Sequence, residues 1–386
     1  TDMYTIRNVN DKASFVFNRK GNKDLTWEKT QNVNVGVEFD IAGIVEGEVD
    51  YFNRLTSDML FLRSTALSQG YASIPVNDGK MRNAGVEFSL TAHAVKTKDV
   101  SLDIRLNGSH YKNSIVELPM DGESGNRMDF YQYTSRFTWV KGGSIYDFYI
   151  PTYKGVDPET GYALYKTLNA VDAAGNVLQE NVTDVELYKK NHKSEQYSLV
   201  EGTPTSDWTK AASDFVGKSA TPKLTGGFGF DLRVKDFSLS TTFTYSLGGY
   251  AYDYVYARLM GDGELGTHNW HKDMENRWSK AGDVTDVPAL TNGTKFGKYA
   301  NARSTRFLTK RNYLQLSNIR LAYNFPESLT SRLGGMHGAQ IYATGENLFL
   351  LSARKGFMPG TTSDGMTSDT QYLPSSSFTV GLKFNF

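Results

Sequence analysis

The chain has 386 residues, no cysteine and balanced charge, with 42 Lys plus Arg against 42 Asp plus Glu, so neither a nucleic-acid-binding function nor a disulfide framework is indicated. Mean hydropathy is -0.45, and no apolar run reaches the roughly 18 residues of a membrane helix, which excludes a helical membrane protein. A transmembrane β-barrel stays possible, because only every second residue of a barrel strand must be apolar.

Aromatic residues make up 13% of the chain, and 36 residues are glycine. Membrane barrels use Tyr at the lipid–water boundaries and Gly in tight strands. The chain begins with Thr1 and shows no charged-then-apolar signal peptide, so we expect a fragment of a longer, processed protein.

Alternation of apolar and polar residues predicts strands after a polar stretch, residues 1–24, that we expect to be irregular. The first strands are 33–41 and 45–51, followed by 86–94 and 102–107, each pair joined by a short turn. Glu46, Glu48 and Asp50 share one strand face and could form a metal or catalytic cluster. We favour the wall of a water-filled lumen, because the same face stays polar on the other strands.

Further along, 131–140 and 145–153 predict a hairpin with poorer alternation, and 227–234 and 237–247 predict two clear strands. One face of the last strand carries only hydroxyl side chains, which suits a wet interior because a packed core would have to supply each hydroxyl with a partner. These residues are Ser238, Ser240, Thr242, Thr244 and Ser246.

The last predicted strands are 318–325, 340–351 and 378–386. The final strand alternates without a break and stops on the aromatic Phe386, as transmembrane barrels do and soluble sandwiches rarely do. The prediction is about eleven strands, each near the roughly 9–11 residues that cross a bilayer when tilted.

Connections between these strands alternate between short and long, as in outer-membrane barrels with short periplasmic turns and longer extracellular loops. The long connections are expected at approximately 53–83, 112–130, 155–220, 248–307 and 352–376. In a β-sandwich, short and long loops are not expected to alternate along the chain. The predicted fold is therefore all-β, an antiparallel transmembrane β-barrel of outer-membrane type.

Several stretches, in this order, resemble the SusC-like (RagA-type) family of TonB-dependent outer-membrane transporters. They are Asp24-Leu25-Thr26-Trp27-Glu28-Lys29-Thr30, Asp50-Tyr51-Phe52-Asn53-Arg54, Met81-Arg82-Asn83-Ala84-Gly85-Val86-Glu87, Gly155-Val156-Asp157-Pro158-Glu159-Thr160-Gly161, Thr221-Pro222-Lys223 with Gly226-Gly227-Phe228, Tyr313-Leu314-Gln315-Leu316-Ser317-Asn318-Ile319-Arg320-Leu321-Ala322-Tyr323, and Gly345-Glu346-Asn347-Leu348-Phe349.

The resemblance covers only the C-terminal part of that family, whose members close roughly 22 strands into one plugged barrel. This chain would supply about the last eleven, without the plug and the N-terminal domains. Its first and last strands would be open edges in lipid, so we expect the missing N-terminal half of the same barrel in a separate chain or outside this sequence.

The resemblance also implies roles for individual residues. Positions of the family motifs are expected to shape the backbone: Trp27, Glu28, Asn83, Gly85, Asp157, Pro158, Gly161 and Asn347. Phe384 and Phe386 resemble the signal read by the barrel-insertion machinery, or they are plain girdle residues.

Candidate substrate contacts lie in an aromatic loop, where flat, polar-edged side chains could stack on sugar rings. They are Tyr250, Tyr252, Trp270, His271 and Trp278. The alternative is that these side chains belong to aromatic girdles or pack loop on loop.

No catalytic constellation, cofactor site or metal site is predicted. Asp121, Gly122, Glu123 and Asn126 have some ligand types of a calcium loop, but the required spacing fails. The glycines at 226–229 lie within a strand with no helix following, so they do not predict a phosphate-binding loop.

The leading functional hypothesis is TonB-dependent import of a nutrient oligomer, a glycan or a peptide, across the bacterial outer membrane. The resemblance implies a SusD-like lipoprotein partner and, through the absent N-terminal part, the TonB complex; membrane lipid would surround the barrel. The alternative is a TonB-dependent siderophore or vitamin receptor. A third hypothesis is a barrel enzyme such as an outer-membrane phospholipase, for which Ser89 and His93 share a strand face.

Overall fold

The computed structural model describes seven segments of the chain: residues 2–122, 124–261, 269–291, 295–330, 337–360, 362–368 and 372–386. Among these residues, no helix combines the length and the apolar character that crossing a membrane would require.

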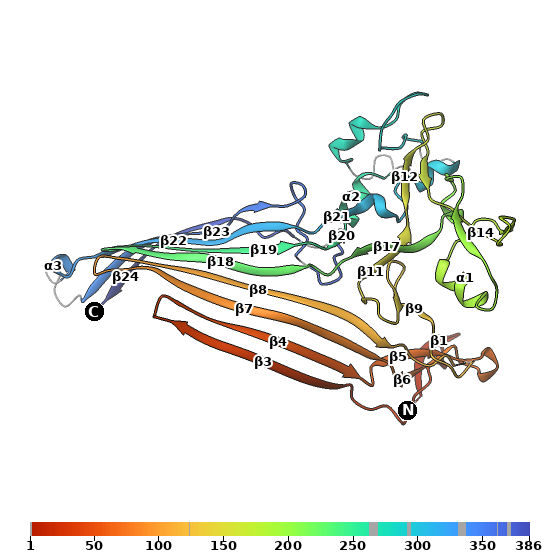
Figure 1. Ribbon diagram of the computed structural model, residues 1–386, viewed down its shortest axis with the longest axis horizontal. Helices are drawn as coiled ribbons and strands as arrows, with labels where there is room; N and C mark the ends of the chain where they lie inside the picture. The colour runs from red at the N-terminus through yellow and green to blue at the C-terminus, as the bar shows by residue number, and fades with distance from the viewer. Residues whose placement is uncertain are drawn as a thin grey trace.

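A single antiparallel sheet of nine strands dominates the described residues (Figure 1). In spatial order its strands are β24 (Ser377–Asn385), β23 (Gly338–Leu351), β22 (Tyr313–Phe325), β19 (Phe237–Leu247), β18 (Leu224–Val234), β8 (Val100–Glu117), β7 (Lys80–Lys96), β4 (Val45–Ser57) and β3 (Lys29–Ile41). Because β24 and β3 each pair with one neighbour within this part of the chain, the sheet has two open edges.

The strand register sorts side chains into rows that alternate between apolar and polar. One row is apolar across seven strands: Val95, Leu102, Leu232, Leu239, Leu321, Ala343 and Val380. A neighbouring row, on the opposite face, is polar: His93, Asp103, Asp231, Ser240, Arg320, Thr344 and Thr379. The sheet therefore has one apolar and one polar face, as the alternation predicts.

In the segments that the structure describes, no second protein layer covers the apolar row. Val380 is 74% exposed, Phe237 54% and Leu321 51%, whereas Leu239 and Phe243 are half-buried between their strand neighbours. No member of the apolar row belongs to a cluster of buried residues in the described segments. Water would be an unfavourable solvent for such a face, which suits hydrocarbon instead.

Connections at the two ends of the sheet differ in length. At one end lie the short turns 42–44, 97–99 and 235–236 and the moderate connection 326–337, which includes α3 (Glu327–Thr330). At the other end are four long connections, 58–79, 118–223, 248–312 and 352–376, which we call the loop domain (Figure 1). The chain runs through β24 toward the short-turn end.

The loop domain has its own small elements. Its strands are β5 (Leu60–Ser64), β6 (Ser73–Asn77), β9 (Phe130–Gln132), β10 (Thr138–Val140), β11 (Asp147–Pro151), β12 (Tyr153–Val156), β13 (Ala163–Tyr165), β14 (Leu168–Val171), β15 (Val177–Gln179), β16 (Ser198–Glu201), β17 (Ser213–Ser219), β20 (Tyr250–Tyr252) and β21 (Leu308–Lys310). Its helices are α1 (Val185–Asn191), α2 (Tyr254–Leu259) and the short 3₁₀ turns η1 (Leu67–Gln69), η2 (Trp208–Lys210), η3 (Lys272–Asn276), η4 (Lys295–Tyr299) and η5 (Thr305–Phe307).

The predicted strands 131–140 and 145–153 do not join the nine-stranded sheet. They break into β9, β10 and β11, and β11 pairs with β17 inside the loop domain. Phe148, Tyr149 and Ile150 are buried in succession, so neither face of this segment is exposed as a bilayer strand requires. The sheet in the described residues accordingly has nine strands where about eleven were predicted.

The prediction that residues 1–24 are irregular is also wrong. They form a hairpin of β1 (Met3–Val9) and β2 (Lys12–Arg19), turning at Asn10 and Asp11, both with positive φ. Asn and Asp tolerate this left-handed conformation, which a two-residue hairpin turn requires.

Strands β7 and β8 extend beyond the predicted ends, with 17 and 18 residues. At about 3.3 Å per residue they span roughly 55 Å, more than a tilted strand needs to cross a bilayer. Most of their additional residues lie at the loop-domain end, where 112–117 belongs to β8 rather than to a loop.

Buried apolar clusters lie in the loop domain and at the adjoining strand ends. The largest brings together segments far apart in sequence: Phe137, Phe148, Ile150, Ala220, Tyr252, Ala257, Met260, Met274 and Phe307. A second cluster packs α1 against β14 through Val185, Tyr188, Leu168 and Ala170. The loop domain is thus packed around its own buried clusters, whereas the rest of the sheet has no buried apolar cluster among the described residues.

Candidate functional site

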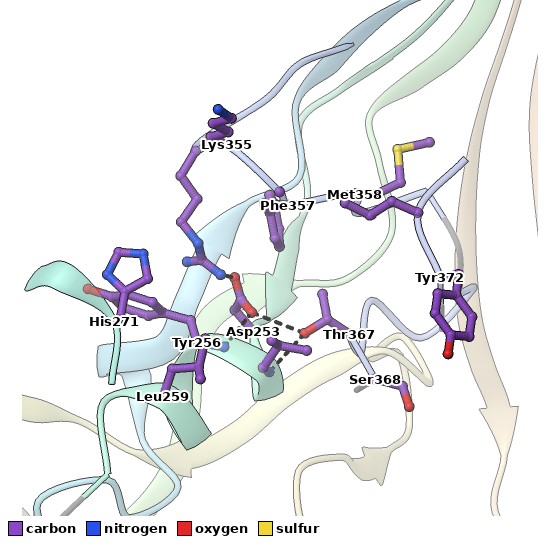
Figure 2. A pocket seen from close by; sticks show the side chains of 14 residues that line it. Asp253, Tyr256, Leu259, His271, Lys355, Phe357, Met358, Thr367, Ser368 and Tyr372 are labelled. Atoms are coloured by element: carbon purple, nitrogen blue, oxygen red, sulfur yellow. Dashed lines mark hydrogen bonds and ion pairs between the residues drawn. The ribbon is translucent and has the colours of Figure 1, made fainter. Parts of the chain in front are cut away.

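A cleft of about 370 Å³ opens in the loop domain between the connections 248–312 and 352–376. Figure 2 places Tyr256 and His271 on one side and Met358 and Tyr372 on the other. Arg354 and Lys355, two cationic residues, also line it. Flat rings beside cations are a surface on which a polar oligomer could stack and form hydrogen bonds.

Asp253 fixes this cleft from beneath. Its side chain is 1% exposed and caps α2, because its Oδ1 accepts a hydrogen bond from the Tyr256 amide at 3.0 Å. The same oxygen accepts a second hydrogen bond from the Thr367 hydroxyl at 3.1 Å. Its Oδ2 forms an ion pair with Arg354. One buried carboxylate therefore joins the two connections that make the cleft.

Charge in the cleft is shaped by burial. Burial lowers the pKa of Arg354 to about 10, and its guanidinium carbon lies 4.2 Å from the centre of the Tyr256 ring. Burial, with a hydrogen bond to Asp273 at 2.8 Å, raises the pKa of Tyr256 to about 12. At neutral pH the cleft therefore presents a charged guanidinium and a neutral phenol.

The five predicted substrate-contact residues separate in space. His271 lines the cleft, with its ring 4.9 Å from that of Tyr256. Trp270, 39% exposed, precedes it, and Tyr250 is half-buried under the ammonium group of Lys218. Tyr252 is 2% exposed within the largest cluster.

Trp278, the fifth, packs on the turn that contains Asp157, Pro158 and Gly161. Its indole Nε1 donates to the Pro158 carbonyl at 2.9 Å. Gly161 has φ +71, and a Cβ there would lie 2.5 Å from the Trp278 ring. Glycine at this position thus permits both the left-handed turn and the close approach of the ring.

Asp157 holds the same turn together. The Thr160 hydroxyl donates to it at 2.7 Å and the Glu159 amide at 3.0 Å, and these hydrogen bonds lower the pKa of its carboxyl below the ordinary 3.8. The ionised form is therefore bound more tightly in the folded turn than in the unfolded chain.

Acid is accordingly expected to loosen this turn. Because the folded pKa is lowered, the stabilisation is fully present above 3.8 and is lost as pH falls through the lowered value. The protection of residues 159–162 against hydrogen exchange, taken relative to the intrinsic rate at each pH between about 6 and about 2, should fall only in the wild type and not in Asp157→Asn. Parallel pH profiles in the two proteins would contradict this assignment.

Asn347 shapes the last hairpin. It has φ +51 and lies in a β-bulge of β23, where two residues oppose one on β22. Its amide accepts from Gln315 Nε2 at 2.8 Å and donates to the Ser375 carbonyl at 3.3 Å. Asn tolerates the left-handed backbone, so this motif residue bends β23 and ties the entry of β24 to it.

The remaining motif residues lie near the loop-domain end of β3, β7 and β8. Glu28 accepts the Leu60 amide at 2.8 Å, and Asn83 accepts from Asn113 at 2.7 Å across the β7–β8 pair. A Cβ on Gly85 would lie 2.2 Å from the His110 carbonyl oxygen, so only glycine fits there. Trp27, which precedes β3, is 90% exposed.

The end of the chain lies on the other open edge. Phe384 is 49% exposed on β24, and Phe386, 82% exposed, follows the strand. On the paired side of β24, the Asn385 carbonyl accepts from the His337 amide at 2.8 Å, which continues the pairing with β23.

The polar face holds ionic groups in mutual contact. His93 Nδ1 lies 2.6 Å from Asp103 Oδ1, and Arg105 pairs with Asp231 at 3.0 Å. Ser89 and His93 are four residues apart on β7, roughly 13 Å along an extended strand, so they form no nucleophile–base pair.

The acidic residues Glu46, Glu48 and Asp50 point to this polar face, and no group of three or more metal-ligand side chains occurs in the described segments. The segment at Asp121 closes as a turn, with its Oδ1 accepting the Ser124 amide at 3.1 Å. Gly122 and Asn126 belong to that turn, whereas Glu123 lies outside the described residues.

Several important residues were not among the predicted ones. Asp253, Arg354 and the buried Arg311 have no motif that marks them, because their partners come from other connections of the loop domain. Asp253 follows Tyr252 directly and begins a helix, which is the one local signal for a cap.

Residues 2–348 match the family described as TonB dependent receptor-like, beta-barrel. The chain belongs to this family. It is 26% identical to TonB-dependent receptor P3 of Formosa agariphila over 95% of the chain, and 24% identical to TonB-dependent receptor SusC of Bacteroides thetaiotaomicron over 95%. It spans only 35% and 32% of these relatives.

A solved structure of the RagAB peptide transporter gives the same result. It superposes on 100% of this TonB-dependent receptor chain with a TM-score of 0.76 and 26% identity, and the chain covers 38% of that structure's chain. The predicted class, an antiparallel β-barrel integral to the bacterial outer membrane, is confirmed, and the family comprises receptors and transporters rather than enzymes.

Proposed function

We propose that the full-length protein imports a nutrient oligomer across the outer membrane, driven by TonB and acting with a SusD-like surface lipoprotein. The observation that carries this proposal is the likeness of the whole chain to a peptide transporter, at a TM-score of 0.76 and 26% identity. The relatives named SusC and TonB-dependent receptor support the same reading.

The geometry is compatible with such a path. The cleft of Tyr256, His271 and Arg354 lies in the loop domain, where a substrate would arrive if the long connections are extracellular. Beyond it, the polar face of the sheet offers a hydrated wall. The surface lipoprotein would cover the loop domain, and strands outside this chain would pair with the open edges of β3 and β24.

Deletion of the gene tests this function. We expect the deletion strain to lose uptake of the oligomers of one polymer, either a glycan or a peptide, and a plasmid copy of the full-length gene to restore it. Normal growth on every oligomer tried, combined with a defect only under iron or vitamin limitation, would instead establish the siderophore or vitamin receptor.

A further inference from the structure

The apolar side of β7 and β8 becomes cationic toward the loop domain. Arg82 of β7 and Lys112 of β8 follow a run of apolar residues on this side, and both are exposed. The register pairs Arg82 with Ser114 and Ala84 with Lys112, so the two cations are diagonal neighbours on one face, with backbones roughly 7–8 Å apart. We call these two residues the outer cation pair.

The opposite side of the same strand segments packs against the loop domain. Ile115 is 2% exposed and Asn113 4%, and Ile115 belongs to a cluster of buried residues there. Successive strand residues point to opposite faces, so Arg82 and Lys112 point away from this cluster. The outer cation pair therefore lies on the outer wall of the barrel and not on the polar face.

The level of these cations along the strands matches the edge of a bilayer. From Val100, next to a short turn, to His110 the strand β8 rises roughly 33 Å, or roughly 25 Å along the membrane normal at a tilt of about 40°. The apolar band of outer-membrane barrels has about this height. Val86 pairs with both His110 and Tyr51, which places Tyr51 at the same level on the apolar side, and Tyr is typical of the lipid–water boundary.

The outer cation pair has no counter-charge from the protein. Among the described residues, neither Arg82 nor Lys112 forms an ion pair. Two other lysines at this end of the sheet are neutralised by carboxylates: Lys29 by Asp58 at 2.8 Å and Lys80 by Glu117 at 3.1 Å. Cations at the level of lipid headgroups attract anionic headgroups, so the counter-charge fits a lipid.

We propose that Arg82 and Lys112 bind the phosphate of a phosphorylated glycolipid in the outer leaflet. The guanidinium fork matches phosphate oxygens, the ammonium adds a point charge, and the apolar side chains of Val86 and Leu106, nearer the middle of the bilayer, adjoin the acyl chains of the same lipid. This assignment takes the long connections to be extracellular, and it does not depend on which nutrient is imported.

Equilibrium binding to the purified full-length protein in nonionic detergent tests the proposal. The probes are fluorescent deep-rough lipopolysaccharide and the same lipid after enzymatic dephosphorylation, and the wild type should bind the phosphorylated form more tightly. Arg82→Gln with Lys112→Gln should weaken that form about tenfold and leave the dephosphorylated form within about twofold. Arg54→Gln is the matched control and should change neither, because Arg54 pairs with Asn83, next to Arg82, on the polar face.

Equal binding of the two lipids by the wild type would overturn the proposal, and so would unchanged binding by the double Gln variant or an equal loss in Arg54→Gln. Binding of inorganic phosphate alone, with the same dependence on Arg82 and Lys112, would indicate a free-anion site and would also overturn it. If the double variant does not fold, raising NaCl from about 50 to about 500 mM should reduce the preference of the wild type for the phosphorylated lipid. A preference that salt leaves unchanged would contradict the proposal.

Discussion

Replacing Arg311 by Met is expected to disorder the loop domain while leaving the sheet assembled. The Arg311 guanidinium is buried and donates to the carbonyls of Pro359 at 3.0 Å, Ala220 at 2.6 Å, Ser363 at 3.1 Å, and Thr362. Met fills similar volume but leaves these carbonyls without donors. The expected cost is about 3–5 kcal/mol of local unfolding free energy.

Hydrogen exchange resolved by segment measures this effect. Protection should fall in residues 352–360 and 213–220, the two connections that Arg311 joins, and not in β18 or β19. Arg320→Met is the matched control, because Arg320 lies further along β22, and its guanidinium, among the described residues, donates to Gln340 at 2.9 Å and lies over the Tyr342 ring rather than joining connections. Equal loss of protection in both variants, or none in Arg311→Met, would show that Arg311 does not join the connections.

A charge at Leu239 is expected to impair assembly, whereas the same charge at the next residue is tolerated. Leu239 belongs to the apolar row, beside Leu232 and Leu321, and Ser240 belongs to the polar row, beside Asp231 and Arg320. An Arg on a lipid-facing strand position costs about 2–4 kcal/mol at the bilayer midplane and about 0–1 kcal/mol near an interface, and Leu239 lies toward the short-turn end of β19. On the polar face the guanidinium stays hydrated.

The two variants, Leu239→Arg and Ser240→Arg, are compared in the full-length protein by the fraction that is folded in outer membranes. This fraction is read from the shift in electrophoretic mobility of unheated samples. Leu239→Arg should accumulate less folded barrel. Ser240→Arg has Arg320 opposite it, so a small loss from like-charge contact is expected there. A greater loss in Ser240→Arg than in Leu239→Arg would contradict the assignment of the two faces.

The strands of the sheet could be predicted because each carries its own period-two pattern. Register follows from the same pattern, since a slip of one residue would bring Leu239 opposite Arg320. The partial alternation of 131–140 and 145–153 predicts a hairpin of the barrel, but Tyr, Phe and Trp favour strands in any environment. Its burial against β17, more than sixty residues later in the chain, is a tertiary contact that no local pattern contains.

The candidate site was predictable in part. Pro and Gly marked the Asp157–Gly161 turn, because few residue types favour such positions. Asn347 was implied by the family resemblance alone, and its bulge and left-handed backbone were not predicted. The cleft was not predictable, because its lining residues come from the connections 248–312 and 352–376, which only the folded chain brings together.

Site-directed labelling tests the central claim, that the two faces of the sheet meet hydrocarbon and water. The chain has no cysteine, so single cysteines at 238, 239, 240, 320, 321, 379 and 380 can be read without background from it. In membranes, lipid-soluble quenchers should reach labels at 239, 321 and 380, and aqueous thiol reagents should reach 238, 240, 320 and 379. Uniform aqueous reactivity along these strands, or protection of 239 and 321 from both reagents, would contradict the account.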